Sequence, residues 1–358
     1  MKVATVVGTR PQFVKAAALS PEIRKCAKEI FIHTGQHYDV EMSKVFFDAL
    51  HMPDPDYNLG IGSASHGRQT GLMLAAVEDV LLKEKPDFVL VHGDTNSTLA
   101  GALAAAKLHI PIGHVEAGLR SGNRSMPEEV NRILVDHLST LLFAPTRNSV
   151  ENLKREGIVD GVHLVGDVMY DLAMRSSSVA STKEVLGKMH LKHNSYVLAT
   201  IHRPVNTDDE RNLRNIMDAL KECGKQVVLP VHPRTAKMIR QFRISFPRSP
   251  GKMIRTKPLD YLVFLGLLMG AEKVVTDSGG VQKEAYFFGK PCITLRDETE
   301  WRETVDAGWN ILVGARKSKI VEAIKTFEPK GRPKASFGDG HAAERIAELV
   351  SGFPAHGS

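Results

Sequence analysis

Short runs of apolar and β-branched residues alternate along the chain with predicted helical segments. The runs of strand length in the first half are Val3–Val7, Ile30–Thr34, Phe88–Val91, Ile112–Val115, Leu141–Ala144 and His163–Val165. Those in the second half are Val197–Ile201, Val227–Val231, Met253–Arg255, Lys273–Thr276 and Cys292–Leu295. Helices are predicted between them, for example over Ser97–Lys107 and over Pro127–Leu138, where a proline and two glutamates form a preferred helix start. Strand–helix alternation of this kind predicts parallel sheets with helices on both faces.

The length and the polar interruption in the middle predict two domains. A chain of 358 residues is too long for one ordinary core. The serine-rich stretch Arg175–Lys183 separates the halves and is the predicted linker. We therefore predict an α/β fold of two doubly wound Rossmann-like domains facing across a cleft. The first covers residues 1–172 and is joined by a C-terminal helix over 341–352, and the second covers residues 184–340.

Polar motifs follow the predicted strands at the places where doubly wound folds bind ligands, beyond the carboxyl ends of the strands. The motifs of the first half are GTRPQFVK (Gly8–Lys15), HGDTNST (His92–Thr98) and HVEAGLRS (His114–Ser121). Those of the second half are IHRP (Ile201–Pro204), VHPRT (Val231–Thr235) and TDSGG (Thr276–Gly280). Six such strand ends indicate a binding site more strongly than they indicate solvated turns.

The segment TDSGGVQKEA, Thr276–Ala285, is typical of a nucleotide cradle. Ser278 is a good N-cap, and Gly279 and Gly280 expose backbone N–H groups to an approaching anion. Glu284 follows about one turn later, where a carboxylate can bind the two hydroxyls of a ribose. The segment therefore predicts a site for the diphosphate and ribose of a nucleotide. The alternative is a loop that only connects a strand to a helix.

Familiar nucleotide and hydrolase motifs are absent from the sequence. It contains no G-x-G-x-x-G after the first strand, no G-x-x-x-x-G-K-[ST], and no G-x-S-x-G around Ser278. The spacing of His92 with Asp94, and of His114 with Glu116, is like that of metal ligands. Because no H-E-x-x-H or cysteine cluster completes a site, we predict acid/base use and no metal.

Composition limits the partners and the compartment. The net charge is +6, but the basic residues are scattered and aromatic residues make up only 6%, which argues against nucleic acid. The longest apolar stretch, Leu262–Ala271, is far too short to span a membrane and predicts a buried helix. The three cysteines, Cys26, Cys223 and Cys292, are far apart in the sequence. This predicts no disulfide framework and a location in the reducing cytoplasm.

Acid/base candidates gather in the first half and anion-binding candidates in both halves. The carboxylates are Asp94, Glu116 and Glu128, whose alternatives are an N-cap, a loop carboxylate and a helix-dipole residue, respectively. Arg10 and Lys15 open the first helix and suit a diphosphate, and His202 with Arg203 can face the same anion.

The motifs GTRPQFVK, TGQHYD, HGDTNSTLAGALAAAKLHIP, HVEAGLRS, MPEEVNR, HPRT and TDSGGVQKEA resemble, in this order, those of the non-hydrolysing UDP-N-acetylglucosamine 2-epimerases. The resemblance implies the two-domain GT-B fold and the conversion of UDP-N-acetylglucosamine to UDP-N-acetylmannosamine without a nicotinamide, a metal or another cofactor. It implies a UDP-binding second domain, and we expect a homodimer. Its site residues are Arg10, Lys15, Asp94, Glu116, Glu128, Arg132, His202, Ser278, Gly279, Gly280 and Glu284, of which Arg132 is implied by the resemblance alone.

The substrate suggests the mechanism. The hydrogen on the second sugar carbon becomes acidic only when UDP leaves the neighbouring carbon, so the protein must first stabilise the leaving diphosphate. A carboxylate then removes the proton to give 2-acetamidoglucal. Return of a proton to the other face, with re-addition of UDP, inverts the centre. Two faces require two acid/base groups, which gives the carboxylates a purpose.

Two departures from the family pattern keep other functions open. Val205 stands in HRPVN where bacterial members have a glutamate in HRREN or HRPEN, which puts activation by a second UDP-sugar in doubt. TEWRE, Thr299–Glu303, replaces TERPE and is similar to the branch acting on UDP-2,3-diacetamido-2,3-dideoxyglucuronate, whose carboxylate could pair with Arg302. A uronate epimerase is therefore the first alternative. A GT-B glycosyltransferase and a hydrolysing epimerase are more distant ones.

Overall fold

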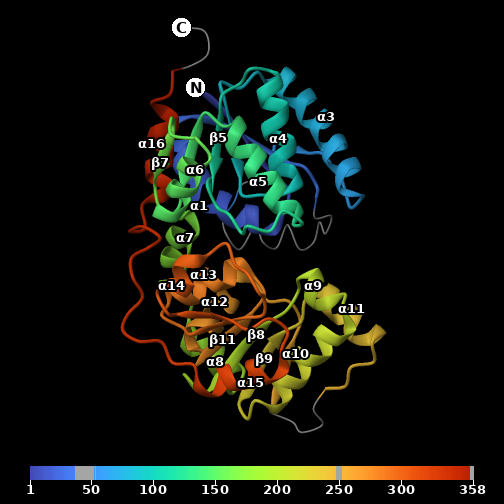
Figure 1. The fold of residues 1–358 in the computed structure, drawn as a ribbon. Coiled ribbons are helices and arrows are strands. Elements are labelled where there is room, and N and C mark those ends of the chain that lie inside the picture. The colour runs from blue at the N-terminus through green and yellow to red at the C-terminus, as the bar shows by residue number, and fades with distance from the viewer. Residues whose placement is uncertain (37–51, 53, 247–251, 355–358) are drawn as a thin grey trace. The chain divides into compact units, whose positions relative to one another are not determined.

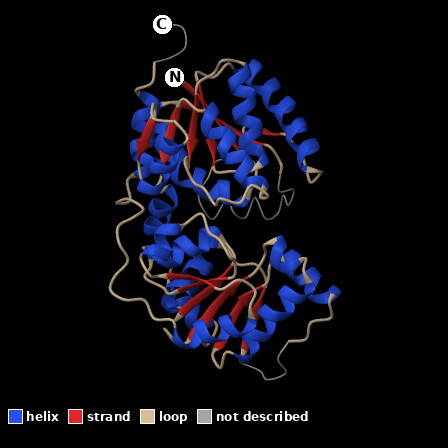
Figure 2. Cartoon of the chain, viewed as in Figure 1, coloured by secondary structure: helices blue, strands red, loops and turns tan. Residues whose placement is uncertain are grey.

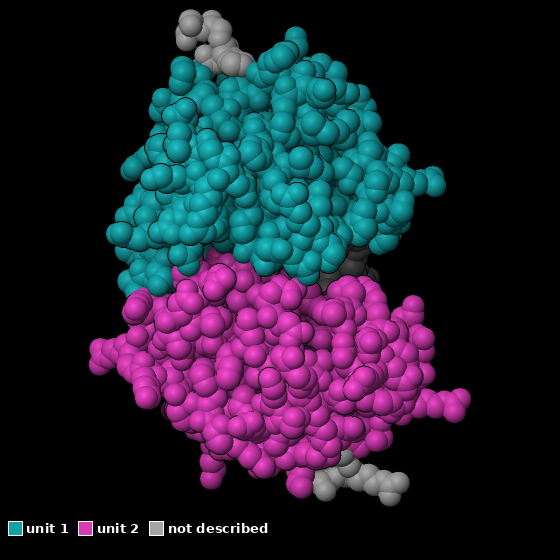
Figure 3. Space-filling model, viewed as in Figure 1, with its two compact units in different colours: residues 1–174, 335–358 teal, residues 175–334 magenta. Residues whose placement is uncertain are grey.

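The computed structural model describes residues 1–36, 52, 54–246 and 252–354, with the chain traced in Figure 1. The chain forms two compact units, which Figure 3 distinguishes by colour. Unit 1 comprises Met1–Met174 with Ala335–Ser358, and unit 2 comprises Arg175–Lys334. Among the described residues, no helix is long and apolar enough to cross a membrane.

The described residues of unit 1 form a seven-stranded sheet in the order β3-β2-β1-β4-β5-β6-β7, and every neighbouring pair in it is parallel. The strands are β1 (Lys2–Val7), β2 (Lys28–His33), β3 (Tyr57–Asn58), β4 (Phe88–His92), β5 (Ile112–Val115), β6 (Leu141–Ala144) and β7 (Val162–Leu164). The strand order reverses direction between β1 and β4. Doubly wound folds bind ligands at such a point, beyond the carboxyl ends of the strands.

Helices cover both faces of this sheet (Figure 2). They are α1 (Arg10–Cys26), α3 (His66–Glu84), α4 (Asn96–Lys107), α5 (Pro127–Leu138), α6 (Arg147–Arg155), α7 (Val168–Ser177) and α16 (Ala342–Ser351). Apolar side chains of α3, α4 and α5 form one core with the alternate residues of β1, β2, β4 and β5 that point to the same face. Helices α1 and α16 pack together.

The C-terminal helix α16 belongs to unit 1, where it packs on α1 and a side chain of α7 binds its first turn. His341 stands at the N-cap position of α16, but its side chain makes no capping hydrogen bond. Instead, Asp171 of α7 accepts a hydrogen bond from Ala343 N at 2.7 Å. The Asp171 side chain thus caps a helix that follows it by more than one hundred and fifty residues.

Unit 2 contains a second parallel sheet, in the order β10-β9-β8-β11-β12-β13. Its strands are β8 (Tyr196–Thr200), β9 (Gln226–Pro230), β10 (Met253–Thr256), β11 (Lys273–Thr276), β12 (Cys292–Thr294) and β13 (Asn310–Leu312). The order is again that of a doubly wound Rossmann-like fold, with its switch point between β8 and β11.

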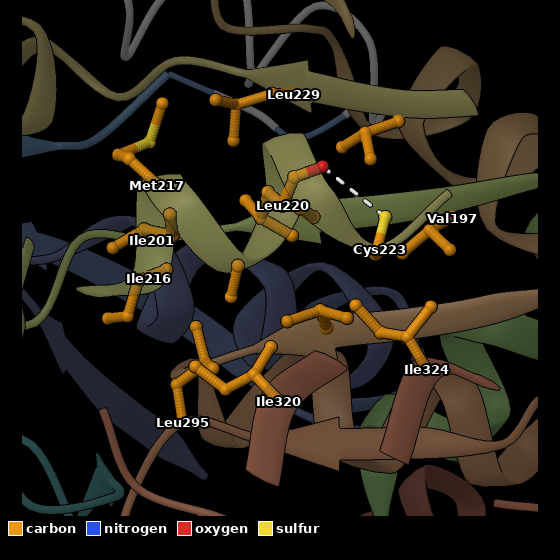
Figure 4. Close-up of a cluster of buried hydrophobic side chains, with 14 of the residues drawn as sticks. Val197, Ile201, Ile216, Met217, Leu220, Cys223, Leu229, Leu295, Ile320 and Ile324 are labelled. Carbon is orange, nitrogen blue, oxygen red and sulfur yellow. Dashed lines mark hydrogen bonds between the residues drawn. The ribbon is translucent and has the colours of Figure 1, made fainter. Parts of the chain in front are cut away.

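The helices of unit 2 are α8 (Thr182–Lys188), α9 (Pro204–Thr207), α10 (Glu210–Glu222), α11 (Pro233–Gln241), α12 (Tyr261–Gly270), α13 (Gly279–Phe287), α14 (Arg302–Asp306) and α15 (Lys317–Thr326). On one face of the sheet, α10 and α15 pack against β8, β9, β11 and β12 (Figure 4). On the other face, α8, α12 and α13 form a second core. The apolar stretch predicted as a buried helix is α12.

The two sheets confirm the predicted α/β class and its doubly wound Rossmann-like units. The prediction did not include strands β3 and β13, which are two and three residues long. The stretch Arg175–Lys183, predicted as a linker, contains the end of α7 and the beginning of α8, and unit 2 begins at Arg175. The serine content that suggested a linker here supplies Ser181, which caps α8.

We predict that Asp171→Ala loosens α16 from unit 1. Loss of a buried hydrogen bond to a charged group should lower the free energy of unfolding by about 1.5–3 kcal/mol. Amide exchange of Ala343 and of the rest of α16 should accelerate. Asp171→Asn keeps an acceptor oxygen. It should therefore lose less than half of the free energy of unfolding that Asp171→Ala loses. Urea unfolding and hydrogen exchange measure both effects, and an Ala variant as stable as the wild type would contradict this role.

Candidate active site

The turn from β1 into α1 is tied to the end of β4 by one side chain. Gln12 Oε1 accepts from Gly8 N at 2.8 Å and from Thr9 N at 3.1 Å. Its Nε2 donates to the His92 carbonyl oxygen at 2.8 Å. The bonds of Gln12 therefore join GTRPQFVK to HGDTNST at the switch point of unit 1. The side chain of Arg10, a predicted site residue in this turn, lies outside what the structure describes.

Gly8 allows three segments to approach one another closely. A Cβ at Gly8 would lie 2.0 Å from Ser97 Oγ and 2.2 Å from Thr34 Oγ1. These two hydroxyls are 2.8 Å apart and hydrogen-bonded. No larger residue fits without moving both neighbours. Thr34 begins the motif TGQHYD, whose last three residues, His37–Asp39, lie outside the described residues.

Lys15 and Glu116 form a buried ion pair. Lys15 lies in the second turn of α1, and Glu116 directly follows β5 with a φ of +74°. The two side chains are 9% and 5% exposed. Removing one partner of a buried pair typically costs about 3–5 kcal/mol, because the other charge is left without compensation. The predicted anion-binding lysine therefore also holds a predicted acid/base residue.

A second ion pair joins Asp94 to Arg132 of α5. Asp94 is 30% exposed, whereas Arg132 is 3% exposed. The N-cap of α4 is Thr95, whose side chain accepts from Thr98 N, so the N-cap alternative for Asp94 is wrong. The Asp94 carboxylate is thus partly open to solvent and fixed by a buried guanidinium, as an acid/base group requires.

The two glutamates that begin α5 differ in their surroundings. Glu128 is half-buried in the first turn. Glu129 is buried, and its carboxylate accepts from Ser121 N at 3.0 Å, Gly122 N at 2.9 Å and Arg132 Nη1 at 2.8 Å. Sequence reasoning assigned Glu129 to the helix dipole alone. It missed the bonds to the loop over residues 121–122, because they depend on how α5 packs.

His92 is a buried histidine beside the Lys15–Glu116 pair. Its ring is 0% exposed, and neither ring nitrogen has a hydrogen-bond partner among the described residues. Burial, together with the charges of Lys15 and His114, lowers the pKa of His92 to about 3. His92 is therefore neutral at physiological pH.

His114 does not gather with other side chains into a metal site. Its two ring nitrogens lie 2.7 Å from Asp136 Oδ1 and 2.7 Å from the Gly93 carbonyl oxygen. Among the described residues, no group of three or more His, Cys, Asp or Glu side chains could hold a metal ion. Asp136 was not among the predicted residues, because its position in the last turn of α5 gave no sign of a partner on β5.

In unit 2, Asp277 organises the loop that follows β8. Its buried carboxylate accepts from His202 N at 3.1 Å, Arg203 N at 3.0 Å and Asn206 Nδ2 at 3.0 Å. His202 Nδ1 lies 3.4 Å from Asp277 Oδ1. The predicted residues His202 and Arg203 are thus brought to TDSGG by its aspartate. The sequence signal was present, since Asp277 lies between the β11 strand end and Ser278.

The first turn of α13 lies against a loop that the sequence did not connect with it. Ser278 stands at the N-cap position, but its hydroxyl makes no capping hydrogen bond, contrary to the expected N-cap role. A Cβ at Gly279 would lie 2.4 Å from Glu300 Oε1 and 3.0 Å from Trp301 Nε1. The TEWRE segment therefore packs on the predicted phosphate site, and a larger residue at position 279 would displace the Glu300 carboxylate. Gly280, the second predicted glycine, is half-buried.

Two arginines flank Glu300. Arg296 follows β12, is buried, and places Nη2 2.9 Å from Glu300 Oε2. Arg203 places Nη2 4.0 Å from Glu300 Oε1. Glu300 thus links two cations beside the first turn of α13. Arg296 and Glu300 were not predicted, since neither stands in a motif that signals a phosphate site.

The remaining residues of unit 2 that the sequence singled out differ in burial. Glu284 is buried on α13. Lys283 beside it places Nζ 3.9 Å from the centroid of the Trp301 ring, a cation–π contact that buries both side chains. Arg302 is exposed at the start of α14, and Val205 is 62% exposed on α9.

The chain is similar over almost its whole length to known sugar-nucleotide enzymes. The family model named UDP-N-acetylglucosamine 2-epimerase matches residues 22–351. A relative from Methanococcus maripaludis, named UDP-N-acetylglucosamine 2-epimerase homolog, is 52% identical over 98% of this chain and 99% of its own. A relative from Pseudomonas aeruginosa, named UDP-2,3-diacetamido-2,3-dideoxy-D-glucuronate 2-epimerase, is 48% identical over 98% of this chain and 99% of its own.

A solved structure is also similar. The crystal structure of Methanocaldococcus jannaschii UDP-GlcNAc 2-epimerase, in complex with UDP-GlcNAc and UDP, is 44% identical with a TM-score of 0.92. The likeness covers 98% of this chain and 99% of that one. It agrees with the doubly wound units described above.

We predict that burial of neutral His92 makes stability depend on pH. The pKa of about 3 lies below the ordinary 6.5, so the unfolded chain takes up a proton first as pH falls. The stabilisation that depends on neutral His92 is complete above the ordinary histidine pKa. It is lost as pH falls toward the pKa of His92 in the folded protein. Between pH 6.5 and pH 5 the free energy of unfolding should decrease by about 2 kcal/mol from this group.

Urea unfolding near pH 8 and near pH 5 measures this dependence. His92→Asn should show a smaller decrease than the wild type over the same range. His193→Asn replaces an exposed histidine and should behave like the wild type. Equal decreases in the wild type and the His92 variant would refute the prediction.

Proposed function

We propose that this chain, which belongs to the UDP-N-acetylglucosamine 2-epimerase family, interconverts UDP-N-acetylglucosamine and UDP-N-acetylmannosamine. One observation carries the proposal. Carboxylates that follow two neighbouring strands, Asp94 after β4 and Glu116 after β5, are each held by a cation. An inversion through a planar intermediate needs two such acid/base groups, one for each face of the sugar.

Unit 2 supplies the groups that suit the leaving diphosphate. The C1–O bond breaks with its electron pair on UDP, so negative charge grows on the phosphate. The first turn of α13 offers backbone N–H groups, and His202 and Arg203 are held beside it by Asp277. Ser278, Gly279 and Gly280 then bind phosphate, and Glu284 binds the ribose.

Unit 1 supplies the proton transfers. As UDP leaves C1, a carboxylate takes the proton from C2, giving 2-acetamidoglucal and a carboxylic acid. A second acid then donates a proton to the opposite face of C2 while UDP returns to C1. Asp94, Glu116 and Glu128 are the proposed acid/base residues, and Lys15 and Arg132 position two of them. The cycle is neutral overall and requires no oxidant and no other reactant.

The proposal also includes an assembly and a place of action. The chain acts as a homodimer in the cytoplasm, on free UDP-sugars and without a cofactor. The three free cysteines fit a reduced compartment. The exposed Val205 fits a form that does not use the glutamate of HRPEN to bind an activating UDP-sugar. The homodimer stays a prediction from the family resemblance.

A uronate epimerase is the second candidate, favoured by the Pseudomonas aeruginosa relative and by TEWRE. A carboxylate bound in the site would need a cation, because burying it unpaired is costly. Arg302, the predicted partner, is exposed. The buried Arg296, by contrast, already pairs with Glu300. The simple sugar remains the leading substrate, because no described contact reserves a cation for the uronate.

We predict that, in heavy water and without added NAD, UDP-N-acetylglucosamine gains one deuterium at C2 as it equilibrates with its epimer. The proton abstracted from one face is replaced from solvent on the other. Mass spectrometry and NMR of the pooled UDP-sugars measure the exchange. Epimerisation with the original hydrogen retained would exclude the mechanism. In the same assay, a higher specificity constant for the diacetamido uronate would favour the second candidate instead.

We predict that Asp94→Asn, Glu116→Gln and Glu128→Gln each lower kcat by roughly a hundredfold or more, the scale of a lost acid/base group. Ser278 and Glu284 substitutions should mainly weaken UDP binding. Glu151→Gln, at an exposed glutamate of α6, is the control and should retain full turnover. Steady-state kinetics with isothermal titration of UDP separates the effects. Near-normal kcat in all three carboxamide variants would remove the acid/base assignment.

A further inference from the structure

His114, on β5, is a buried histidine whose two ring nitrogens both face hydrogen-bond acceptors. Nδ1 lies 2.7 Å from Asp136 Oδ1, and Nε2 lies 2.7 Å from the Gly93 carbonyl oxygen. The His114 and Asp136 side chains are both 0% exposed. A carbonyl oxygen can only accept a hydrogen bond, so Nε2 must carry a hydrogen.

The second acceptor, Asp136 of α5, is an ionised carboxylate. It also accepts from Gly118 N at 3.1 Å and from Arg120 Nη1 at 2.7 Å. Burial works to raise the pKa of Asp136, but His114 and Arg120 outweigh it and hold the pKa below its ordinary value. Because an ionised carboxylate cannot donate, Nδ1 of His114 carries a hydrogen as well. The ring is therefore an imidazolium.

The imidazolium holds the turn that leads from β4 to Asp94. Gly93 has a φ of +65°, and its N–H donates to the Val115 carbonyl oxygen at 2.9 Å. Its own carbonyl accepts from His114, so the backbone of Gly93 is fixed on both sides by β5. Asp94 is the next residue, and its carbonyl accepts from Asn131 Nδ2 at 2.9 Å.

The same turn lies against the Lys15–Glu116 pair. A Cβ at Gly93 would lie 2.7 Å from Lys15 Nζ and 3.4 Å from Glu116 Oε2. A shift of the Gly93 peptide would therefore change the position of Asp94 relative to Glu116. These are two of the carboxylates proposed to remove and return the proton at C2 of the sugar. Small displacements of this kind lower catalytic rates strongly, because proton transfer requires short, aligned contacts.

We propose that His114 is a positioning residue for the reaction. Its imidazolium, held by Asp136, fixes the Gly93 peptide and thereby places the Asp94 carboxylate for proton transfer. His114 does not itself exchange a proton with the sugar. This inference rests on the proposed epimerase function.

The first test removes the donor to Gly93 and then restores it. His114→Leu should lower kcat by about tenfold or more, with KM and the dissociation constant of UDP within about twofold. His114→Gln offers a neutral N–H donor and should recover most of the lost kcat. His163→Leu replaces a histidine of β7 in the same sheet and should leave kcat unchanged. An unchanged kcat in the Leu variant, or a loss that the Gln variant does not recover, would overturn the proposal.

The second test does not depend on activity or on variant stability. Nitrogen-15 NMR of the ligand-free wild type should show that Nε2 of one buried imidazole carries a hydrogen, and that its Nδ1 does as well. The resonances are assigned to His114 by their loss in His114→Gln or, if that variant does not fold, by selective labelling of neighbouring residues. A ring whose Nε2 carries no hydrogen would overturn the proposal, because it could not donate to the Gly93 carbonyl oxygen. Failure of the proposed function would appear separately, as a wild type that exchanges no deuterium at C2.

Discussion

The requirement that buried charge be compensated governs both clusters at the carboxyl edges of the sheets. In unit 1 the charges are compensated by side chains, Lys15 with Glu116 and Arg132 with Asp94. In unit 2 the buried Asp277 is compensated mainly by N–H groups of the loop after β8. An isolated buried charge costs several kcal/mol, so the surrounding elements cannot move apart without breaking these contacts. The groups proposed for catalysis are therefore placed by the same interactions that hold the strand ends together.

Close backbone approach is the second condition that the two clusters share. Side chains of other segments occupy the space where a Cβ would stand at Gly8, Gly93 and Gly279. Glycine at these positions lets strand-end loops lie within hydrogen-bonding distance of one another. The functional consequence differs between the units. In unit 1, Gly8 leaves room for the hydroxyls of Ser97 and Thr34, and Gly93 leaves room for the Lys15–Glu116 pair. In unit 2, Gly279 leaves room for Glu300 at the first turn of α13.

The substitution of TEWRE for TERPE has a local physical explanation. Trp301 is buried beneath the Lys283 ammonium, and Arg296 with Arg203 flanks the neighbouring Glu300. An aromatic ring stabilises a buried ammonium without adding a charge, so this segment keeps its cations close to the proposed phosphate site. The aromatic ring of Trp301 and these cations thus surround the proposed UDP site beside the serine and the glycines of TDSGG.

The sequence by itself determined the class of fold, because hydrophobic runs of strand length alternating with helices permit few architectures. It also determined that the polar motifs follow the strands, and hence that Asp94, Glu116 and His202 stand at carboxyl edges. Only the tertiary structure decided their partners. Lys15 and Glu116 are 101 residues apart, and Asn206 and Asp277 are 71 apart. The roles of Asp136, Glu129 and Arg296 were likewise invisible, since a carboxylate or guanidinium within a helix or a loop has no local pattern. Such partners are chosen by strand order and helix packing, which depend on contacts between distant segments that hydrophobic periodicity along one chain does not encode.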